Sequence, residues 1–207
     1  MKKLMAAVLA VVLLLALAAC GQPKEEAQTV GGWTIPDSAG LTEEAKTAFD
    51  KALEGLTGVS YTPVALLGTQ LVSGTNYSIL CEAAVVYPGA QPYYAVVTVY
   101  QDLQGKAEIL NIRALDLGTI LESGEIADAD APDGQLPGGW QVDRESAVDV
   151  EGAELHLASQ LVSGTNHCVL CRGWTLTFVY ESLDGSTEIL KTVPLDPAEL
   201  AMRAAED

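Results

Sequence analysis

Apolar and polar positions follow two kinds of pattern along this chain of 207 residues. Between Leu41 and Leu53, apolar residues recur at helical spacing, with Thr42 placed as the N-cap and Gly55 and Gly58 following the end. This pattern predicts one amphipathic helix. Beyond it, short apolar runs bounded by Gly and Pro predict four antiparallel strands, at about 59–70, 75–87, 93–103 and 106–116.

The same order of motifs occurs a second time with parts missing. The heptapeptide QLVSGTN at Gln70–Asn76 returns unchanged at Gln160–Asn166, ninety positions later. Apolar runs flank each copy, and the Ser-Gly pair within it predicts the turn of a β-hairpin. Gly-Gly-Trp precedes both copies at an offset of 107, whereas the later strands recur at an offset of 80. The second copy has therefore lost about one helix and its turn before the hairpin.

The missing helix leaves open what covers the second sheet, because a curved sheet without a cover would expose its apolar face to water. Asp196–Ala205 begins with a capping Asp and a Pro at the first helical position, so it predicts a C-terminal helix as one cover. The first repeat is the other possible cover of the second sheet. Without its helix the second hairpin is expected to be held less rigidly, so the first repeat is expected to carry any binding.

The N-terminus has the layout of an export signal. Met1–Lys3 is basic, Leu4–Ala19 carries no charge, and the stretch ends in Leu-Ala-Ala-Cys-Gly around Cys20. This end resembles the lipobox of bacterial lipoproteins. The resemblance implies a lipoprotein signal peptide at 1–19, lipidation of Cys20 and a lipid-anchored location on the extracytoplasmic face of the bacterial cell membrane. Residues 20–29, which are mostly polar, are expected to form a tether.

Charge and composition divide the rest of the chain. The formal net charge of −17 argues against nucleic acid as a partner. Residues 118–137 mix acidic residues with Gly and Ala and predict a solvated linker, between a first repeat at 30–117 and a shortened second repeat at 138–207. An EF-hand is excluded in this linker, because Pro132 stands where a calcium ligand belongs and no Glu closes the loop.

Residues suited to catalysis are few. Cys168 and Cys171 point to opposite faces of one predicted strand, so their spacing predicts neither a mutual bridge nor a zinc or redox site. Cys81 and Cys171 are expected either as two buried thiols or as a disulfide. His156 and His167 fit no catalytic or haem-binding motif. We therefore expect a protein that is not an enzyme and holds no metal or cofactor.

The heptapeptide at Gln70–Asn76, with Tyr77 after it, resembles the first inhibitory hairpin of the cystatins. Their signature is Gln-x-Val-x-Gly, commonly continued as Thr-Asn-Tyr. The resemblance implies an α+β fold in which a cystatin-like antiparallel sheet is wrapped on one helix, repeated in tandem with a shortened second copy. It also implies a reversible inhibitor that plugs the cleft of a papain-like cysteine protease with an apolar wedge.

The resemblance places the protease-binding wedge on particular residues of both copies. They are Val30, Gly31, Gly32, Gln70, Leu71, Val72, Ser73, Gly74 and Leu103 in the first copy, and Gln160, Val162 and Gly164 in the second. Leu103 stands in a turn where cystatins usually carry Pro-Trp, which departs from the pattern. The alternative is a non-inhibitory cell-envelope binding or structural module, since one fold hosts many functions.

The lipidation hypothesis predicts the behaviour of one variant. Cys20→Ala removes the thiol that would carry the diacylglycerol, and lipid chains anchor by burying methylene groups, at about 0.8 kcal/mol each. We expect the variant either to leave the membrane fraction or to keep its signal peptide. Cell fractionation with immunoblotting measures both properties. A variant that is cleaved normally and stays with the membrane contradicts the hypothesis.

Overall fold

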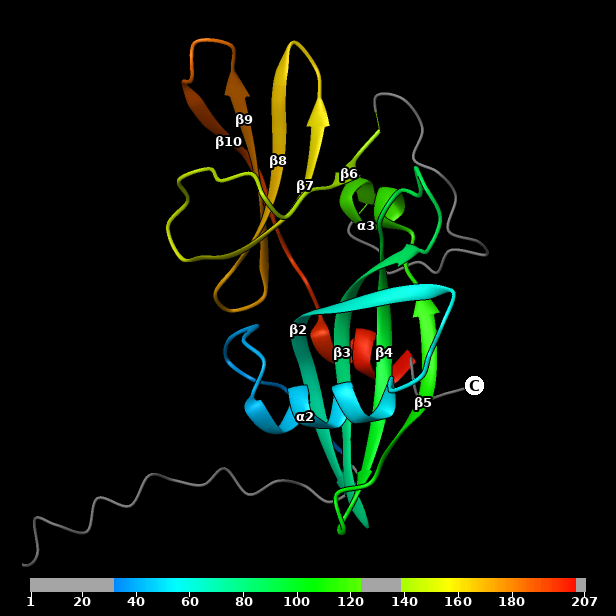
Figure 1. Ribbon diagram of the computed structural model, residues 1–207. Helices are drawn as coiled ribbons and strands as arrows, with labels where there is room; N and C mark the ends of the chain where they lie inside the picture. Colours follow the sequence, from blue (N-terminus) through cyan, green and yellow to red (C-terminus); the bar gives the residue numbers. More distant parts are fainter. Residues whose placement is uncertain (1–31, 124–138, 204–207) are drawn as a thin grey trace, which may run out of the picture.

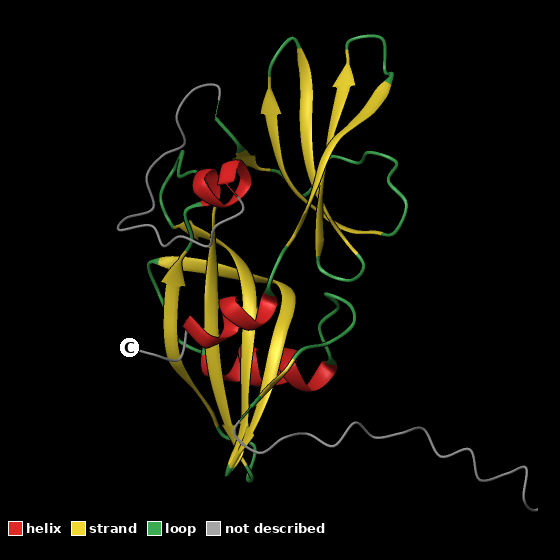
Figure 2. Ribbon diagram, turned by 180° about the vertical axis from the view of Figure 1, so that it is seen from behind, coloured by secondary structure: helices red, strands yellow, loops and turns green. Residues whose placement is uncertain are grey.

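The computed structural model describes residues 32–123 and 139–203. These residues form two antiparallel sheets of five strands each, with three short helices (Figures 1 and 2). The first sheet has the order β1 (Trp33–Thr34), β2 (Val59–Val72), β3 (Gly74–Val85), β4 (Tyr93–Asp102) and β5 (Ala107–Ala114). The second has the same order, with β6 (Gln141–Val142), β7 (Ala153–Leu161), β8 (Gly164–Cys171), β9 (Thr175–Ser182) and β10 (Thr187–Pro194).

The predicted fold class, an α+β fold with a cystatin-like sheet wrapped on one helix and repeated in tandem, is wrong. Strands account for 53% of the described residues and helices for 14%, so this part of the chain is mainly β. The three short helices are distributed unequally between the two sheets. Both α2 (Glu43–Ala52) and α4 (Pro197–Arg203) pack on the first sheet. Within residues 139–203 the second sheet has no counterpart of α2, because the residues that would form it are missing from the second repeat.

Helix α2 forms where the apolar stripe predicts it. The side chain of Thr42 accepts a hydrogen bond from the backbone N–H of Ala45 at 3.2 Å, so its predicted role as N-cap is confirmed. Glu43 and Glu44 in the first turn stabilise the positive end of the helix dipole. The helix buries Ala45, Ala48 and Phe49 against strand residues that include Ile79, Cys81, Val97 and Val99.

The C-terminal helix α4 is present, but it does not cover the second sheet by itself. Its neighbours are β1, β2 and β4 of the first sheet, where Leu200 and Ala201 are buried on the face opposite α2. A third helix, α3 (Leu117–Ser123), lies where the sequence predicts the start of the linker, and it buries Ile120 and Leu121. Residues 124–137 of that predicted linker lie outside the described residues, as do the predicted signal peptide and tether.

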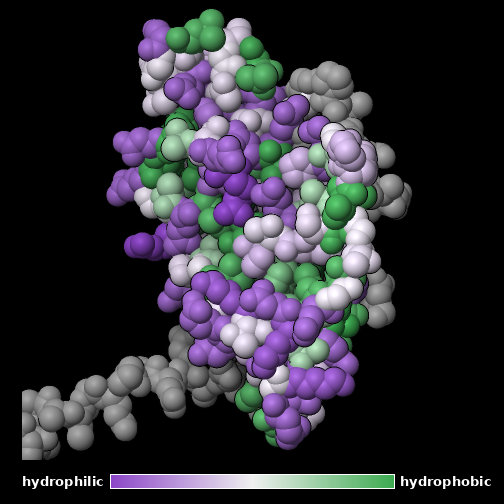
Figure 3. Space-filling view, viewed as in Figure 1, coloured by the Kyte–Doolittle hydropathy of each residue, from purple (hydrophilic) through white to green (hydrophobic). Residues whose placement is uncertain are grey.

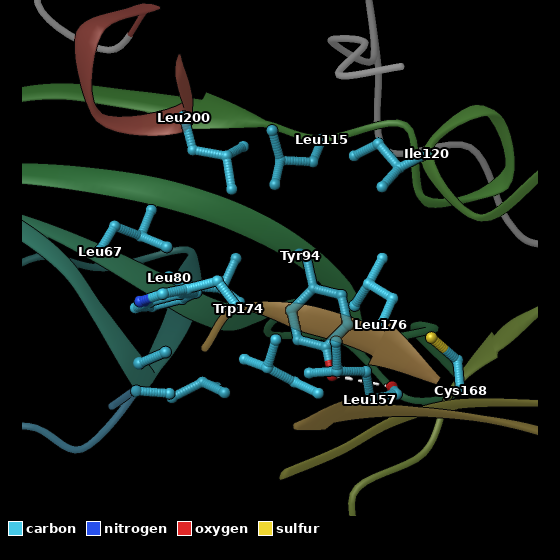
Figure 4. Packing of buried hydrophobic residues seen from close by; sticks show 14 of the residues in the cluster. Leu67, Leu80, Tyr94, Leu115, Ile120, Leu157, Cys168, Trp174, Leu176 and Leu200 are labelled. Atoms are coloured by element: carbon cyan, nitrogen blue, oxygen red, sulfur yellow. Dashed lines mark hydrogen bonds between the residues drawn. The ribbon is translucent and has the colours of Figure 1, made fainter. Parts of the chain in front are cut away.

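One apolar core joins the two sheets (Figure 4). It contains residues of β2, β3 and β4 together with residues of β7, β8 and β9, and α3 and α4 close its side. Polar contacts cross the same boundary: the Tyr94 hydroxyl donates to the Leu157 carbonyl at 2.8 Å, and Trp174 Nε1 donates to the Pro36 carbonyl at 2.7 Å. The first repeat is therefore the cover of the second sheet, which was one of the two covers considered from the sequence.

The two sheets share even their irregularities. Leu67 in β2 and Leu157 in β7 are each skipped in the pairing with the next strand, and Leu110 in β5 and Leu190 in β10 are skipped in the same way. Such bulges bend a strand and increase its twist. The second repeat therefore keeps the curvature of the first sheet although it lacks the helix.

The shared core predicts that the two repeats unfold together. Leu176 in β9 is 2% exposed and lies in this core, so Leu176→Ala should lower the free energy of unfolding by about 2 to 5 kcal/mol. Leu190→Ala, at an exposed position of β10, is the control and should change it by less than about 0.5 kcal/mol. Urea unfolding followed by tryptophan fluorescence and by circular dichroism should give one transition. Two transitions, with only one shifted by Leu176→Ala, contradict the shared core.

Candidate functional site

Three segments of the first repeat meet at one end of its sheet. They are Gly32–Thr34, the β2–β3 turn at Val72–Gly74 and the β4–β5 turn at Asp102–Lys106, and we call this end edge 1. Trp33 pairs with Gln70 near the tip of the first hairpin, and Gly74 pairs with Asp102 of the next strand. Both turns lie at the lower end of the molecule in Figure 1.

Internal contacts hold the first hairpin of edge 1 in shape. Asn76 Nδ2 donates to Gln70 Oε1 at 2.7 Å, and the Tyr100 hydroxyl donates to the carbonyl oxygen of Ser73 at 3.0 Å. A Cβ on Gly74 would lie 2.7 Å from Tyr100 Cε2 and would also clash with the carbonyl oxygen of Gln101. The close approach of the turn to β4 therefore requires glycine, and three residues of the heptapeptide have structural roles.

Edge 1 exposes three apolar side chains beside exposed polar residues of the same turns. Val72 is 39% exposed and Leu103 is 80% exposed, and Leu71 beside Val72 is exposed to a similar degree. Exposed apolar side chains that cluster, rather than occurring singly, indicate an interaction site. Of the residues predicted to lead the wedge, Gly32 lies next to the paired Trp33, while Val30 and Gly31 lie outside the described residues. The predicted lipidation site Cys20 also lies outside them.

The second repeat forms an equivalent end, which we call edge 2, from the turns at Val162–Gly164 and Ser182–Ser186. Asn166 Nδ2 donates to Gln160 Oε1 at 3.0 Å, and the Tyr180 hydroxyl donates to the Ser163 carbonyl at 3.0 Å. A Cβ on Gly164 would lie 2.8 Å from Tyr180 Cε2. The expectation of a loosely held second hairpin is therefore wrong, because the same contacts hold both hairpins.

A chain of polar side chains crosses the strands behind edge 2. His156 Nδ1 contacts the carbonyl oxygen of Asp143, and His156 Nε2 lies 2.9 Å from His167 Nδ1. His167 Nε2 lies 3.1 Å from Glu181 Oε2. All three contacts become hydrogen bonds when His156 is protonated on Nδ1 and His167 on both nitrogens. These hydrogen bonds then join β7, β8 and β9 to residue 143, at the start of the segment between β6 and β7.

The sequence alone did not reveal this His–His–Glu chain, because each histidine fits an ordinary strand position. The signal was available in the comparison of the two repeats. At the offsets of 90 and 80, the corresponding residues of the first repeat are Leu66, Tyr77 and Gln101. Leu66 and Tyr77 pack beneath α2, so polar residues replace them in the repeat that lacks this helix.

The cysteines of the described residues are structural. Cys81, Cys168 and Cys171 are buried free thiols, so the predicted pair of buried thiols at Cys81 and Cys171 is found and the disulfide is not. Burial raises the pKa of Cys168 to about 12, and it also raises the pKa of Cys81. Because the thiolate is the reactive form, these two thiols are poorly suited to nucleophilic or redox chemistry.

Within residues 32–123 and 139–203, no group of three or more His, Cys, Asp or Glu side chains is placed to hold a metal ion. No helix in the same part of the chain is long and apolar enough to cross a membrane. Comparisons with protein-family models, with curated proteins and with solved structures found no match.

The geometry around Gly74 predicts the effect of adding a single methyl group. Gly74→Ala should force the turn away from β4 and lower the free energy of unfolding by about 1 to 3 kcal/mol, because the new Cβ meets backbone and a packed ring. Gly40→Ala is the control: its nearest neighbour would be Ser38 Oγ at 3.8 Å, and the change should stay within about 0.5 kcal/mol. Urea unfolding measures both. Equal small effects contradict the proposed role of Gly74.

Proposed function

We propose that this protein is a lipid-anchored binding protein, not an enzyme, that inhibits a papain-like cysteine protease by inserting edge 1 into its cleft. The observation that carries the proposal is the meeting of Gly32, Val72 and Leu103 at one end of a rigid sheet, with apolar side chains exposed there. These are three of the positions at which the resemblance to the cystatins places the wedge.

The proposed inhibition needs shape and apolar surface rather than chemistry. Each Å² of apolar surface that Leu71, Val72 and Leu103 bury in a cleft contributes roughly 25 cal/mol. Binding also costs the ordering of flexible groups, and a preformed hairpin has less left to order. The bonds from Tyr100 to Ser73 and from Asn76 to Gln70 provide this preformed shape.

A non-inhibitory module of the cell envelope is the second candidate, and two observations favour it. The β4–β5 turn presents Leu103 and Gln104, which offer less apolar area than the Pro-Trp that the resemblance leads us to expect. In addition, the contacts of Gln70, Gly74 and Asn76 within the hairpin give these residues a structural role without any partner. This candidate predicts a stable protein that leaves papain-like proteases fully active.

Edge 1 can be tested alone in a chain that carries Val162→Asp at the second hairpin. Adding Val72→Asp to that chain should weaken the inhibition of papain at least about 100-fold, because the carboxylate would lose its water in an apolar cleft. Leu110→Asp is the control, since Leu110 is 52% exposed in β5 away from the turns, and it should leave inhibition unchanged. The inhibition constant is measured by titrating papain with chain that begins at Gln22.

Circular dichroism should show that all three variants are folded, since the substituted side chains are exposed. Absence of inhibition by the chain with both hairpins intact, at micromolar concentration, contradicts the inhibitor proposal and favours the non-inhibitory module.

A further inference from the structure

We propose that edge 2 is a second partner-binding wedge, so that one chain holds two molecules of the same class of partner, one at each end. The inference rests on the proposed function of edge 1. It extends that function to the second hairpin, which the sequence predicted to be held less rigidly. The partner is a protein with an apolar cleft.

The tip of edge 2 exposes the same types of apolar side chain as the tip of edge 1. Val162 is 50% exposed and Leu183 is 90% exposed, and Leu161 is exposed beside Val162. Figure 3 shows hydrophobic side chains at the upper end of the molecule, where the turns of edge 2 lie. Edge 2 therefore offers at least as much apolar surface for burial as edge 1.

The repeat of Leu and Val at both tips is not explained by packing. Internal contacts account for Gln160, Gly164 and Asn166, but the side chains of Leu161 and Val162 point into solvent, where a polar residue would keep the hairpin equally well. Meanwhile positions buried beneath α2 in the first repeat have changed in the second, Leu66 to His156 and Tyr77 to His167. Exposed side chains that stay the same while buried ones change indicate contact with a partner.

Edge 2 is supported from behind as firmly as edge 1, by different means. The His156–His167–Glu181 chain ties β7, β8 and β9 together on the face that has no helix. On the other face, Cys168 and Phe178 lie in the core shared with the first sheet. The hairpin is therefore presented in a fixed position, which limits the entropy lost on binding.

The two edges lie at opposite ends of the molecule, so bound partners would not obstruct each other. In Figures 1 and 2 the turns β2–β3 and β4–β5 lie at the lower end, and the turns β7–β8 and β9–β10 lie at the upper end. The shared core fixes this arrangement. A partner with one cleft can therefore occupy each end independently, giving two partners per chain.

Charge further defines the partner that suits edge 2. Glu181, Asp184 and Ser186 stand where the first repeat has Gln101, Gln104 and Lys106. Hydrogen bonds from the Ser182 hydroxyl and from the backbone and side chain of Ser186 lower the pKa of the Asp184 carboxyl to about 2. The turn is thus negative at neutral pH. A cleft that fits edge 2 has an apolar floor and no carboxylates at the rim.

The stoichiometry of the complex with papain tests the inference. The full-length chain, purified in detergent, is mixed with excess papain, and the number of papain molecules per chain is measured by analytical ultracentrifugation. We expect two for the unchanged chain, one for Val72→Asp, one for Val162→Asp, and none for the double variant. Leu190→Asp is the control for the second repeat, because Leu190 is 52% exposed in β10, and it should leave the number at two.

Each alternative result has a separate meaning. One papain per chain, lost with Val72→Asp and retained with Val162→Asp, overturns the inference about edge 2 and leaves the proposed function of edge 1 intact. No papain on any chain overturns both. If Val162→Asp unfolds the protein by circular dichroism, Leu183→Asp at the neighbouring turn replaces it and should also reduce the number from two to one.

Discussion

The apolar core between the two sheets is the constraint on which the rest of the structure depends. A sheet with apolar residues on both faces needs two covers, and the first sheet has α2 on one face and the core with α4 on the other. The second sheet buries one face in that same core, and the His156–His167–Glu181 chain lies on its other face. Neither repeat is complete without the other, so the loss of one helix has made two similar repeats into one packing unit.

The same loss explains why a buried histidine is tolerated in the second sheet. An unpaired polar group away from water costs roughly 1 to 3 kcal/mol, so His167, which is 4% exposed, needs a partner for each ring nitrogen. His156 and Glu181 supply them. Where α2 is present, the first repeat has Leu66 and Tyr77 at the corresponding positions and fills the space by apolar packing. The two sheets have the same bulges, but they stabilise one of their faces by different means. The first uses apolar packing under α2, and the second uses hydrogen bonds between polar side chains.

The sequence predicted local structure well and the assembly poorly. The N-cap at Thr42, the strands of the first repeat and the hairpin at Gln70–Asn76 follow from periodicity and turn chemistry, which act over a few residues. The capping Asp196 and Pro197 also predicted a C-terminal helix, but they could not indicate that Leu200 packs on the first sheet, because local signals do not specify which element a helix packs against. The single-helix fold was wrong for that reason. The support from Tyr100 was missed because it joins separate hairpins.

The position of the predicted lipid anchor gives the two edges different surroundings. Gly32 lies at edge 1, and the twelve residues from Cys20 to Gly32 span at most about 40 Å when fully extended. With Cys20 in the membrane as proposed, edge 1 stays within that distance of the lipid surface, and edge 2 lies at the opposite end of the molecule. A partner at edge 1 has to fit close to the membrane or approach from the side. Edge 2 does not share this limit, so the wedge that looked weaker in the sequence is the more accessible one to a partner arriving from solution.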